Sequence, residues 1–315
     1  MITQEKIERF FQTRIGLNIS QIEKESGMPA RTLHRAFQEK KTIPTKYMPA
    51  LESVLRQYGY SDALFEKATI ISVVNHKGGV GKTTTTINVG KALSLMGNRV
   101  LLIDMDSQGN LSQCYGIHQP SEQIINALLD DESLPIIEIN DNLHLSPSDI
   151  TMADRESEFS SAVGAERRLA LKIQEIEKNY DYILIDCPPS LGICTISSLV
   201  ASNQCLIPIQ PEASAFHGVD NLFKRIKQVQ TYSNPNLRIK GIVFTMVLNQ
   251  NIHKALMEQI REKYSNFNVC ESMIDNSKYL RESQVMQQDI FTYNPKSLPS
   301  EQYNNLAKEL INSKS

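Results

Sequence analysis

The sequence contains few cysteines, no long apolar run and almost no net charge. Its five cysteines are odd in number and show no C-x-x-C spacing, which argues against a disulfide framework or a zinc knuckle. No uninterrupted apolar run approaches the roughly 18 residues that span a bilayer, and the first ten residues mix charged with apolar side chains, unlike a signal peptide. We therefore expect reduced thiols in a cytoplasmic protein, with no membrane attachment.

The near neutrality of the whole chain hides a small asymmetry. The net charge is −2, from 33 Lys and Arg against 35 Asp and Glu over 315 residues. Counting along the sequence, residues 1–67 hold 11 basic and 8 acidic side chains, which leaves 22 against 27 for the rest. A basic front part is weak evidence for contact with nucleic acid.

The pattern of apolar residues changes character near residues 61–69. Before this point the apolar spacings are helical, whereas after it continuous apolar runs alternate with helix-length segments such as 167–178. Such runs are typical of parallel strands buried on both faces. We predict a small all-α domain at 1–66 and, at 67–315, an α/β domain with a doubly wound, mostly parallel sheet. The strands are expected at 70–74, 99–103, 182–185, 204–208 and 239–244.

A glycine-rich loop follows the first predicted strand and precedes a helix expected to begin near Thr83. Glycines let backbone amides turn toward a polyphosphate, and the helix N-terminus adds partial positive charge. Lys82 is expected between the β and γ phosphates of ATP, and the Thr83 hydroxyl on Mg²⁺. The alternative to a phosphate-binding loop is a tight turn with an exposed lysine. The loop also departs from the usual P-loop motif, because His76 stands where that motif has glycine. The predicted nucleotide-binding loop comprises Lys77, Gly78, Gly79, Val80, Gly81, Lys82, Thr83 and Thr84.

Acidic residues follow two of the predicted strands, at the edge where open α/β sheets bind ligands. Alternation places Asp104 and Asp106 on one side of the chain, and Asp106 is the candidate that orients the attacking water; a helix cap is its alternative role. Asp186 ends a strand of Walker B form and is expected to hold Mg²⁺ through water, or to serve only as an N-cap. Pro188 would stiffen a loop that senses the γ-phosphate. Thr83, Asp106 and Asp186 are thus the candidate metal site.

Residues 18–41 read as a helix, a turn at 26–28 and a second helix from 29 to 40, and they resemble the helix-turn-helix of phage-repressor-like regulators. Leu33 and neighbouring apolar residues would face inward, leaving Arg31, Thr32 and Arg35 to face a DNA groove. The alternative is a helical module that assists dimerisation or partner contact.

Three segments resemble, in order, the deviant Walker A, switch I and switch II motifs of the ParA/MinD family of ATPases: 77–84, 102–110 and 182–190. The resemblance runs through 69–312 and fits the ParA branch best. It implies that two subunits sandwich two ATP molecules, with Lys77 reaching the partner's nucleotide and joining Lys82 and Asp106 as a catalytic residue. It further implies nonspecific DNA binding by the ATP-bound homodimer, a ParB-like activator, association with the nucleoid and, with the front module, repression of its own operon.

The sequence departs from the family pattern in the segments that supply DNA-contacting arginines. Residues 248–250 are Leu-Asn-Gln where relatives often have Asp-x-Arg, and 274–279 also lack the arginine. Ser107 replaces a common proline. The cations that can substitute for these arginines along a DNA backbone are Lys254, Lys278 and Arg281, with Arg261 and Lys263 nearby. The alternative is that they are ordinary solvent-exposed residues on helix faces.

Three other functions compete with DNA segregation. A MinD-like membrane-cycling ATPase would need a basic amphipathic C-terminal helix, but the apolar stripe at 303–311 has only Lys308 beside it and is expected in the core. An iron–sulfur reductase like the nitrogenase iron protein would need cysteines that Cys187 and Cys194 do not match. A transcription regulator that uses nucleotide only as a signal is the third.

Overall fold

The computed structural model describes residues 2–14, 16–39, 41–61, 67–212 and 215–312. Within them an eight-stranded sheet has the order β3-β4-β2-β5-β1-β6-β7-β8. The edge strand β3 runs antiparallel to β4, and the other neighbouring pairs are parallel. The strands are β1 Thr69–Val73, β2 Val100–Asp104, β3 Ile137–Asn140, β4 Leu143–Ser146, β5 Tyr182–Asp186, β6 Gln204–Ile209, β7 Arg238–Val247 and β8 Val269–Asp275.

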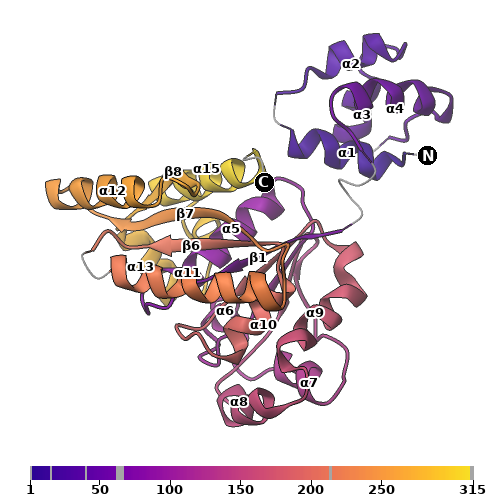
Figure 1. The fold of residues 1–315 in the computed structure, drawn as a ribbon. Coiled ribbons are helices and arrows are strands. Elements are labelled where there is room, and N and C mark those ends of the chain that lie inside the picture. The colour runs from indigo at the N-terminus through magenta and orange to yellow at the C-terminus, as the bar shows by residue number, and fades with distance from the viewer. Residues whose placement is uncertain (1, 15, 40, 62–66, 213–214, 313–315) are drawn as a thin grey trace.

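Helices bury both faces of the sheet. Successive strand residues point to opposite faces, so that Ile70 and Ile183 join one hydrophobic cluster while Ile71 and Leu184 join the other. The first face is covered by α7 Ile124–Leu129, α8 Met152–Ser161, α9 Ala165–Ile176, α10 Ile193–Ala201, α11 Ala215–Tyr232 and α12 Asn251–Lys263. The second is covered by α5 Lys82–Leu95, α6 Asn110–Cys114, α13 Lys278–Val285, α14 Ile290–Tyr293 and α15 Leu298–Asn312. Figure 1 shows α10 and α11 in front of the strands and α5 behind them.

The doubly wound α/β prediction is confirmed, and the five predicted strands correspond to β1, β2, β5, β6 and β7. Three strands were not predicted: β3, β4 and β8. Two of them, β3 and β8, are the edges of the sheet, where partly exposed residues interrupt the apolar pattern. Continuous apolar runs identify strands that are buried on both faces, but they do not identify partly exposed edge strands.

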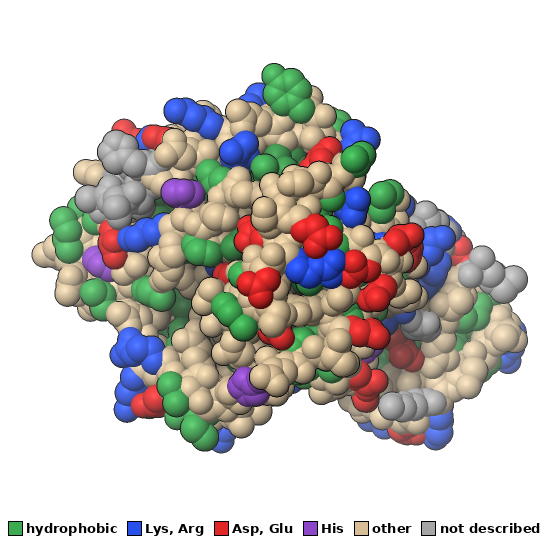
Figure 2. Space-filling view, turned by 90° about the horizontal axis from the view of Figure 1, so that it is seen from below, with side chains coloured by type: hydrophobic (Ala, Val, Ile, Leu, Met, Phe, Trp, Pro, Cys, Tyr) green, Lys and Arg blue, Asp and Glu red, His purple; other side chains and the backbone are tan. Residues whose placement is uncertain are grey.

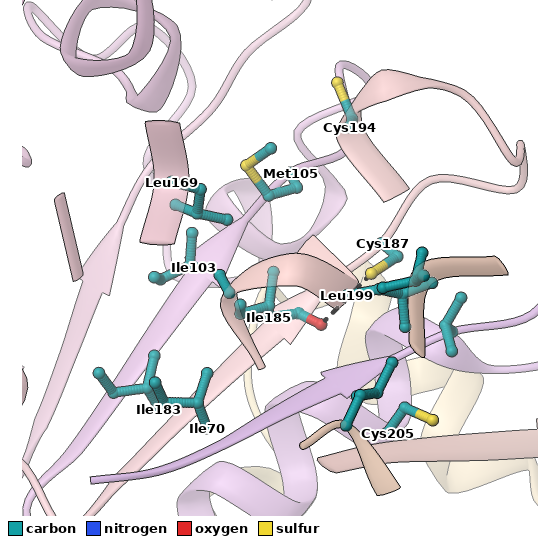
Figure 3. Close-up of a cluster of buried hydrophobic side chains, with 14 of the residues drawn as sticks. Ile70, Ile103, Met105, Leu169, Ile183, Ile185, Cys187, Cys194, Leu199 and Cys205 are labelled. Carbon is teal, nitrogen blue, oxygen red and sulfur yellow. Dashed lines mark hydrogen bonds between the residues drawn. The ribbon is translucent and has the colours of Figure 1, made fainter. Parts of the chain in front are cut away.

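The cysteines lie in the core as separate thiols. All five belong to the described residues, and each is buried and free of any disulfide. In Figure 3, Cys187 lies among apolar side chains of the first face, and its Sγ donates to the Ile185 carbonyl at 3.8 Å. Burial raises the pKa of the Cys187 thiol to about 12, so the thiolate that would bind a metal or react is disfavoured.

The described residues at the front of the chain form four helices, α1 Gln4–Thr13, α2 Ile19–Glu25, α3 Thr32–Glu39 and α4 Met48–Gln57, with the 3₁₀ turn η1 Thr45–Tyr47. Their apolar faces make a third cluster, drawn entirely from residues 2–60 and including Phe10, Ile22 and Leu55. The predicted start of the second helix at residue 29 is wrong, because Arg31 has a left-handed φ of 68° and α3 begins at Thr32.

The C-terminal helix belongs to the core of the α/β domain. Tyr303, Leu306, Ala307 and Leu310 are buried in the second cluster, so the apolar stripe of α15 is not available to a lipid surface. No helix among the described residues is long and apolar enough to cross a membrane.

Candidate nucleotide site

The glycine-rich loop lies where β1 ends and α5 begins. Gly79 and Gly81 have φ angles of 74° and 81°, a left-handed conformation that side chains rarely adopt. The Thr245 hydroxyl, on β7, donates to the Val80 carbonyl at 2.8 Å and anchors the loop to a neighbouring strand. A cradle of main-chain amides therefore stands at the N-terminus of a 14-residue helix, which is suited to bind phosphate.

Lys82, the first residue of α5, is buried inside this cradle. Its side chain is 6% exposed, and Nζ donates to the Lys77 carbonyl at 3.2 Å across the loop. Burial lowers the pKa of Lys82, and the carboxylates of Asp186 and Asp106 partly oppose that shift. A buried cation with one neutral acceptor gains most when an anion enters the loop.

Asp186, at the carboxyl end of β5, fits a metal-bound water. The residue is fully buried, and Oδ1 accepts from the Thr86 hydroxyl at 3.3 Å. Oδ2 accepts no hydrogen bond from the residues that the structure describes. Burial, reinforced by the charge of Asp104, raises the pKa of Asp186 well above its ordinary value. A cation near this edge would favour the charged form again, so the residues present fit Mg²⁺ beside Thr83.

The two acids that follow β2 differ in their surroundings. Asp104 is fully buried and accepts from the backbone amide of Asp106 and from both the amide and the hydroxyl of Ser112. Asp106 is 7% exposed, and its Oδ1 accepts from the Gln108 amide at 3.0 Å. The structure thus places Asp106 at the cavity wall and Asp104 behind it.

A cavity of about 500 Å³ lies in front of the loop. Of the residues predicted to bind nucleotide or metal, Lys77, Val80, Asp186 and Pro188 do not line it. Pro188 is buried, and the next residue, Pro189, lines the cavity in its place, 3.8 Å from where a Cβ on Gly78 would lie. The predicted residues that line the cavity are Gly78, Gly79, Gly81, Lys82, Thr83, Thr84 and Asp106.

Sequence reasoning missed the wall formed by α13. Gln284 Nε2 donates to the Thr84 hydroxyl at 2.7 Å, although 200 positions separate the two residues. Gln287 Nε2 lies 3.1 Å from His118 Nε2 at the same rim. A smaller, mainly apolar cavity of about 180 Å³ continues from this wall. It is lined by Gly81, Thr84, Thr245, Met246, Ile274, Asp275, Asn276, Ser277, Leu280, Arg281, Gln284 and Tyr303. Apart from Gly81 and Thr84, which belong to the predicted loop, no spacing in the sequence marked these residues for a nucleotide site.

Lys77 lies at the rim of the loop rather than inside it. Its Nζ forms an ion pair with Glu212, which follows β6, and the two side chains are 35% and 40% exposed. Its amide donates to the Asn75 side chain at 3.0 Å. The two lysines of the loop therefore occupy different environments, one buried and one directed toward the surface.

The predicted DNA-contacting residues of the α/β domain lie on two helices, α12 and α13. Lys254, Lys278 and Arg281 are exposed, and Arg281 also donates to the Asn276 side chain at 2.6 Å and lines the smaller cavity. Arg261 is bound to the carbonyls of Val269 and Cys270. Lys263 pairs with Asp220.

In the front module Arg31 and Arg35 are exposed, and the Thr32 hydroxyl donates to the Pro29 carbonyl. The structure leaves these two arginines accessible but does not gather them with the cations of the α/β domain into one described site.

A phosphate cradle on a doubly wound sheet, with carboxylates at the ends of adjacent strands, defines a P-loop nucleoside triphosphatase. A family model described as an AAA domain matches residues 68–239. The sporulation initiation inhibitor protein Soj of Bacillus subtilis is 38% identical over 247 residues, covering 76% of this chain and 97% of that protein. The chromosome partitioning protein ParA of Caulobacter vibrioides is 32% identical over 252 residues, covering 77% and 93%. The chain belongs to the ParA/MinD family of ATPases.

Solved structures share the fold of the α/β domain. Cobyrinic acid a,c-diamide synthase from Mycobacterium smegmatis, solved with an ATP analog and magnesium, superposes with a TM-score of 0.67 at 28% identity over 76% of this chain and 93% of that one. A putative plasmid partition protein from Borrelia burgdorferi bound to AMPPNP gives 0.67 at 25% identity over 77% and 98%.

Proposed function

We propose that this protein is an ATPase of DNA segregation that binds ATP with Mg²⁺, dimerises around it and hydrolyses it slowly. The observation that carries the proposal is the difference between the two loop lysines: Lys82 is enclosed by the phosphate cradle, and Lys77 reaches outward from it. Relatives named for chromosome partitioning, matched over 93% and 95% of their length, support the same activity.

The triphosphate is expected on the amides of the loop, with Lys82 against the β and γ phosphates. Thr83, Asp106 and Asp186 would hold Mg²⁺, directly or through water. When bound, the ion neutralises charge that builds up on the phosphate oxygens. Asp106, at the cavity wall, would orient the attacking water. These assignments agree with the burial of Lys82 and with the Asp186 oxygen that lacks a described donor.

The smaller cavity is suited to the adenine base. It adjoins the phosphate cavity through four shared lining residues, Gly81, Thr84, Met246 and Gln284. Its wall is mostly apolar, and Asn276 is among the residues that line it. An aromatic base is stabilised by such a slot through apolar burial, and one or two polar groups set its orientation.

Lys77 would act only after it exchanges partners. In the single chain its ammonium is held by Glu212, and in the ATP-bound homodimer it would contact the nucleotide of the partner subunit. Phosphate oxygens carry more negative charge than one carboxylate, so ATP in the partner favours the exchange. ATP binding would thereby drive dimerisation, and hydrolysis would weaken the dimer.

DNA is the proposed track of the ATP-bound dimer, which would associate with the nucleoid. Figure 2 shows acidic side chains gathered on the underside of the molecule, where Figure 1 places α7 and α8. That face repels a phosphate backbone. Lys254 on α12, with Lys278 and Arg281 on α13, are the exposed candidates for DNA contact. A ParB-like protein is the proposed activator of hydrolysis.

The front module is proposed to bind an operator through α3, with Arg31, Thr32 and Arg35 toward the groove. Glu23 of α2 supports this arrangement, because its two carboxylate oxygens accept from the amides of Arg31 and Leu33 at 2.8 and 2.7 Å. The carboxylate satisfies amides at the start of α3 and fixes the angle between the two helices.

The test compares the wild-type protein with Lys77→Gln. ATPase rate is measured with and without nonspecific DNA, and gel shifts and sedimentation are run in ATP and in ADP. The wild type is expected to dimerise and to shift DNA in ATP but not in ADP. Lys77→Gln is expected to bind a nonhydrolysable ATP analogue within about threefold of the wild type while it stays monomeric. Equal DNA binding in ATP and ADP would contradict the proposal.

A further inference from the structure

Asp104 is a buried carboxylate that takes no part in the proposed binding of nucleotide or metal. It ends β2 directly beside Asp186 of β5, in register with it, and its side chain is 0% exposed. Burial raises its pKa to about 7. Two carboxylates buried side by side repel each other, so each needs its own set of hydrogen-bond donors to be stable there.

The donors around Asp104 all come from the segment that carries Asp106. Oδ1 accepts from the Asp106 amide at 3.2 Å, and Oδ2 accepts from the Ser112 amide at 3.0 Å and the Ser112 hydroxyl at 2.8 Å. One side chain thus binds both ends of the loop between β2 and α6. A carboxylate that accepts several hydrogen bonds fixes its donors closely.

The same network continues to the next strand. The Ser112 hydroxyl, while donating to Asp104, accepts from the Ser148 amide at 3.0 Å, just beyond β4. Gly109, at the tip of the loop, lies so close to this strand end that a Cβ would come within 2.9 Å of the Ser148 carbonyl oxygen. The loop is therefore fixed against β4 as well as against its own strand.

We infer that Asp104 is a positioning residue, which holds the β2–α6 loop so that Asp106 faces the bound nucleotide. This inference rests on the proposed function in so far as Asp106 acts in hydrolysis. Asp104 itself does not line the nucleotide cavity. Its loss is expected to leave the phosphate cradle intact and to misplace Asp106, because a shift of about 1 Å in a catalytic group costs much of its effect.

The test uses Asp104→Asn, which keeps the shape of the side chain but presents an amide N–H₂ to a backbone donor. With a nonhydrolysable ATP analogue, affinity is expected within about threefold of the wild type, whereas kcat falls by about tenfold or more. Amide hydrogen exchange of residues 105–112 in the nucleotide-free protein is expected to speed up by about tenfold. Exchange needs no ATPase activity, so it tests the network even if the proposed function fails.

Two further variants make the result interpretable. Ser112→Ala removes one hydrogen bond to Asp104 and the link to Ser148, and is expected to move kcat and exchange in the same direction by a smaller amount. The matched control is Ser72→Ala, because Ser72 is a buried serine of β1 whose hydroxyl donates to the carbonyl of Ser198. This variant is expected to change neither kcat nor the exchange of residues 105–112. Should Asp104→Asn not fold, Ser112→Ala decides. If amide exchange in both Asp104→Asn and Ser112→Ala is as slow as in the wild type, the inference is overturned. It is also overturned if Asp104→Asn exchanges at the wild-type rate but needs more Mg²⁺ for activity, because Asp104 would then belong to the metal site.

Discussion

Replacing Lys82 by methionine should separate nucleotide binding from folding. Methionine has a similar length and no charge. Without nucleotide the buried ammonium makes one hydrogen bond to a neutral acceptor, at 3.2 Å, and burial lowers its pKa. Because burial disfavours the ammonium more than the carboxylates of Asp186 and Asp106 favour it, its removal is expected to change the free energy of unfolding by no more than about 1 kcal/mol.

Binding should respond very differently. A charged donor on a phosphate in a partly dry site contributes about 2–4 kcal/mol, so the affinity for an ATP analogue with Mg²⁺ should weaken about 30- to 700-fold. Calorimetric titration measures the affinity, and urea denaturation measures the stability. The control is Lys240→Met on β7, another lysine whose burial lowers its pKa. Binding by Lys82→Met within about fivefold of the wild type would refute the assignment of the phosphate loop.

Three other variants test separate parts of the structure. Asp106→Ala should keep the ATP-bound dimer, seen by sedimentation, while turnover falls about 100-fold; normal hydrolysis would remove its catalytic assignment. Gly109→Ala must place a side chain at a φ of 62° and 2.9 Å from a carbonyl oxygen, so urea denaturation should show a loss of about 2–3 kcal/mol, and an unchanged midpoint would contradict this close approach. Glu23→Ala leaves two amides at the start of α3 without their acceptor, at a cost of about 1–3 kcal/mol. Faster amide hydrogen exchange in residues 19–39 should reveal this loss of stability. The control is Glu25→Ala, at an exposed position, and equal protection in the two variants would exclude the capping role of Glu23.

The distinction between Asp104 and Asp106 illustrates the limit of sequence reasoning at this site. Alternation along the chain placed both acids on one side, and both follow the same strand. The structure gives Asp104 three donors from the loop and leaves Asp106 at the cavity wall. Which acid meets the ligand depends on how the loop turns back toward its own strand, and no periodicity encodes that turn.

The sequence by itself determined the elements whose physics is local. Apolar runs predicted the central strands, because such strands are buried on both faces. The glycines before Lys82 predicted the phosphate loop, since backbone amides can turn inward only where side chains do not obstruct them.

Tertiary structure alone decided which distant residues complete the site. Gln284 meets Thr84 across 200 positions, and Glu212 meets Lys77 across 135. Such pairs arise when the sheet brings the ends of separate strands and helices to one edge. Hydrophobic patterning specifies which faces are buried, but the distances between loops at that edge follow only from the packing of the whole domain.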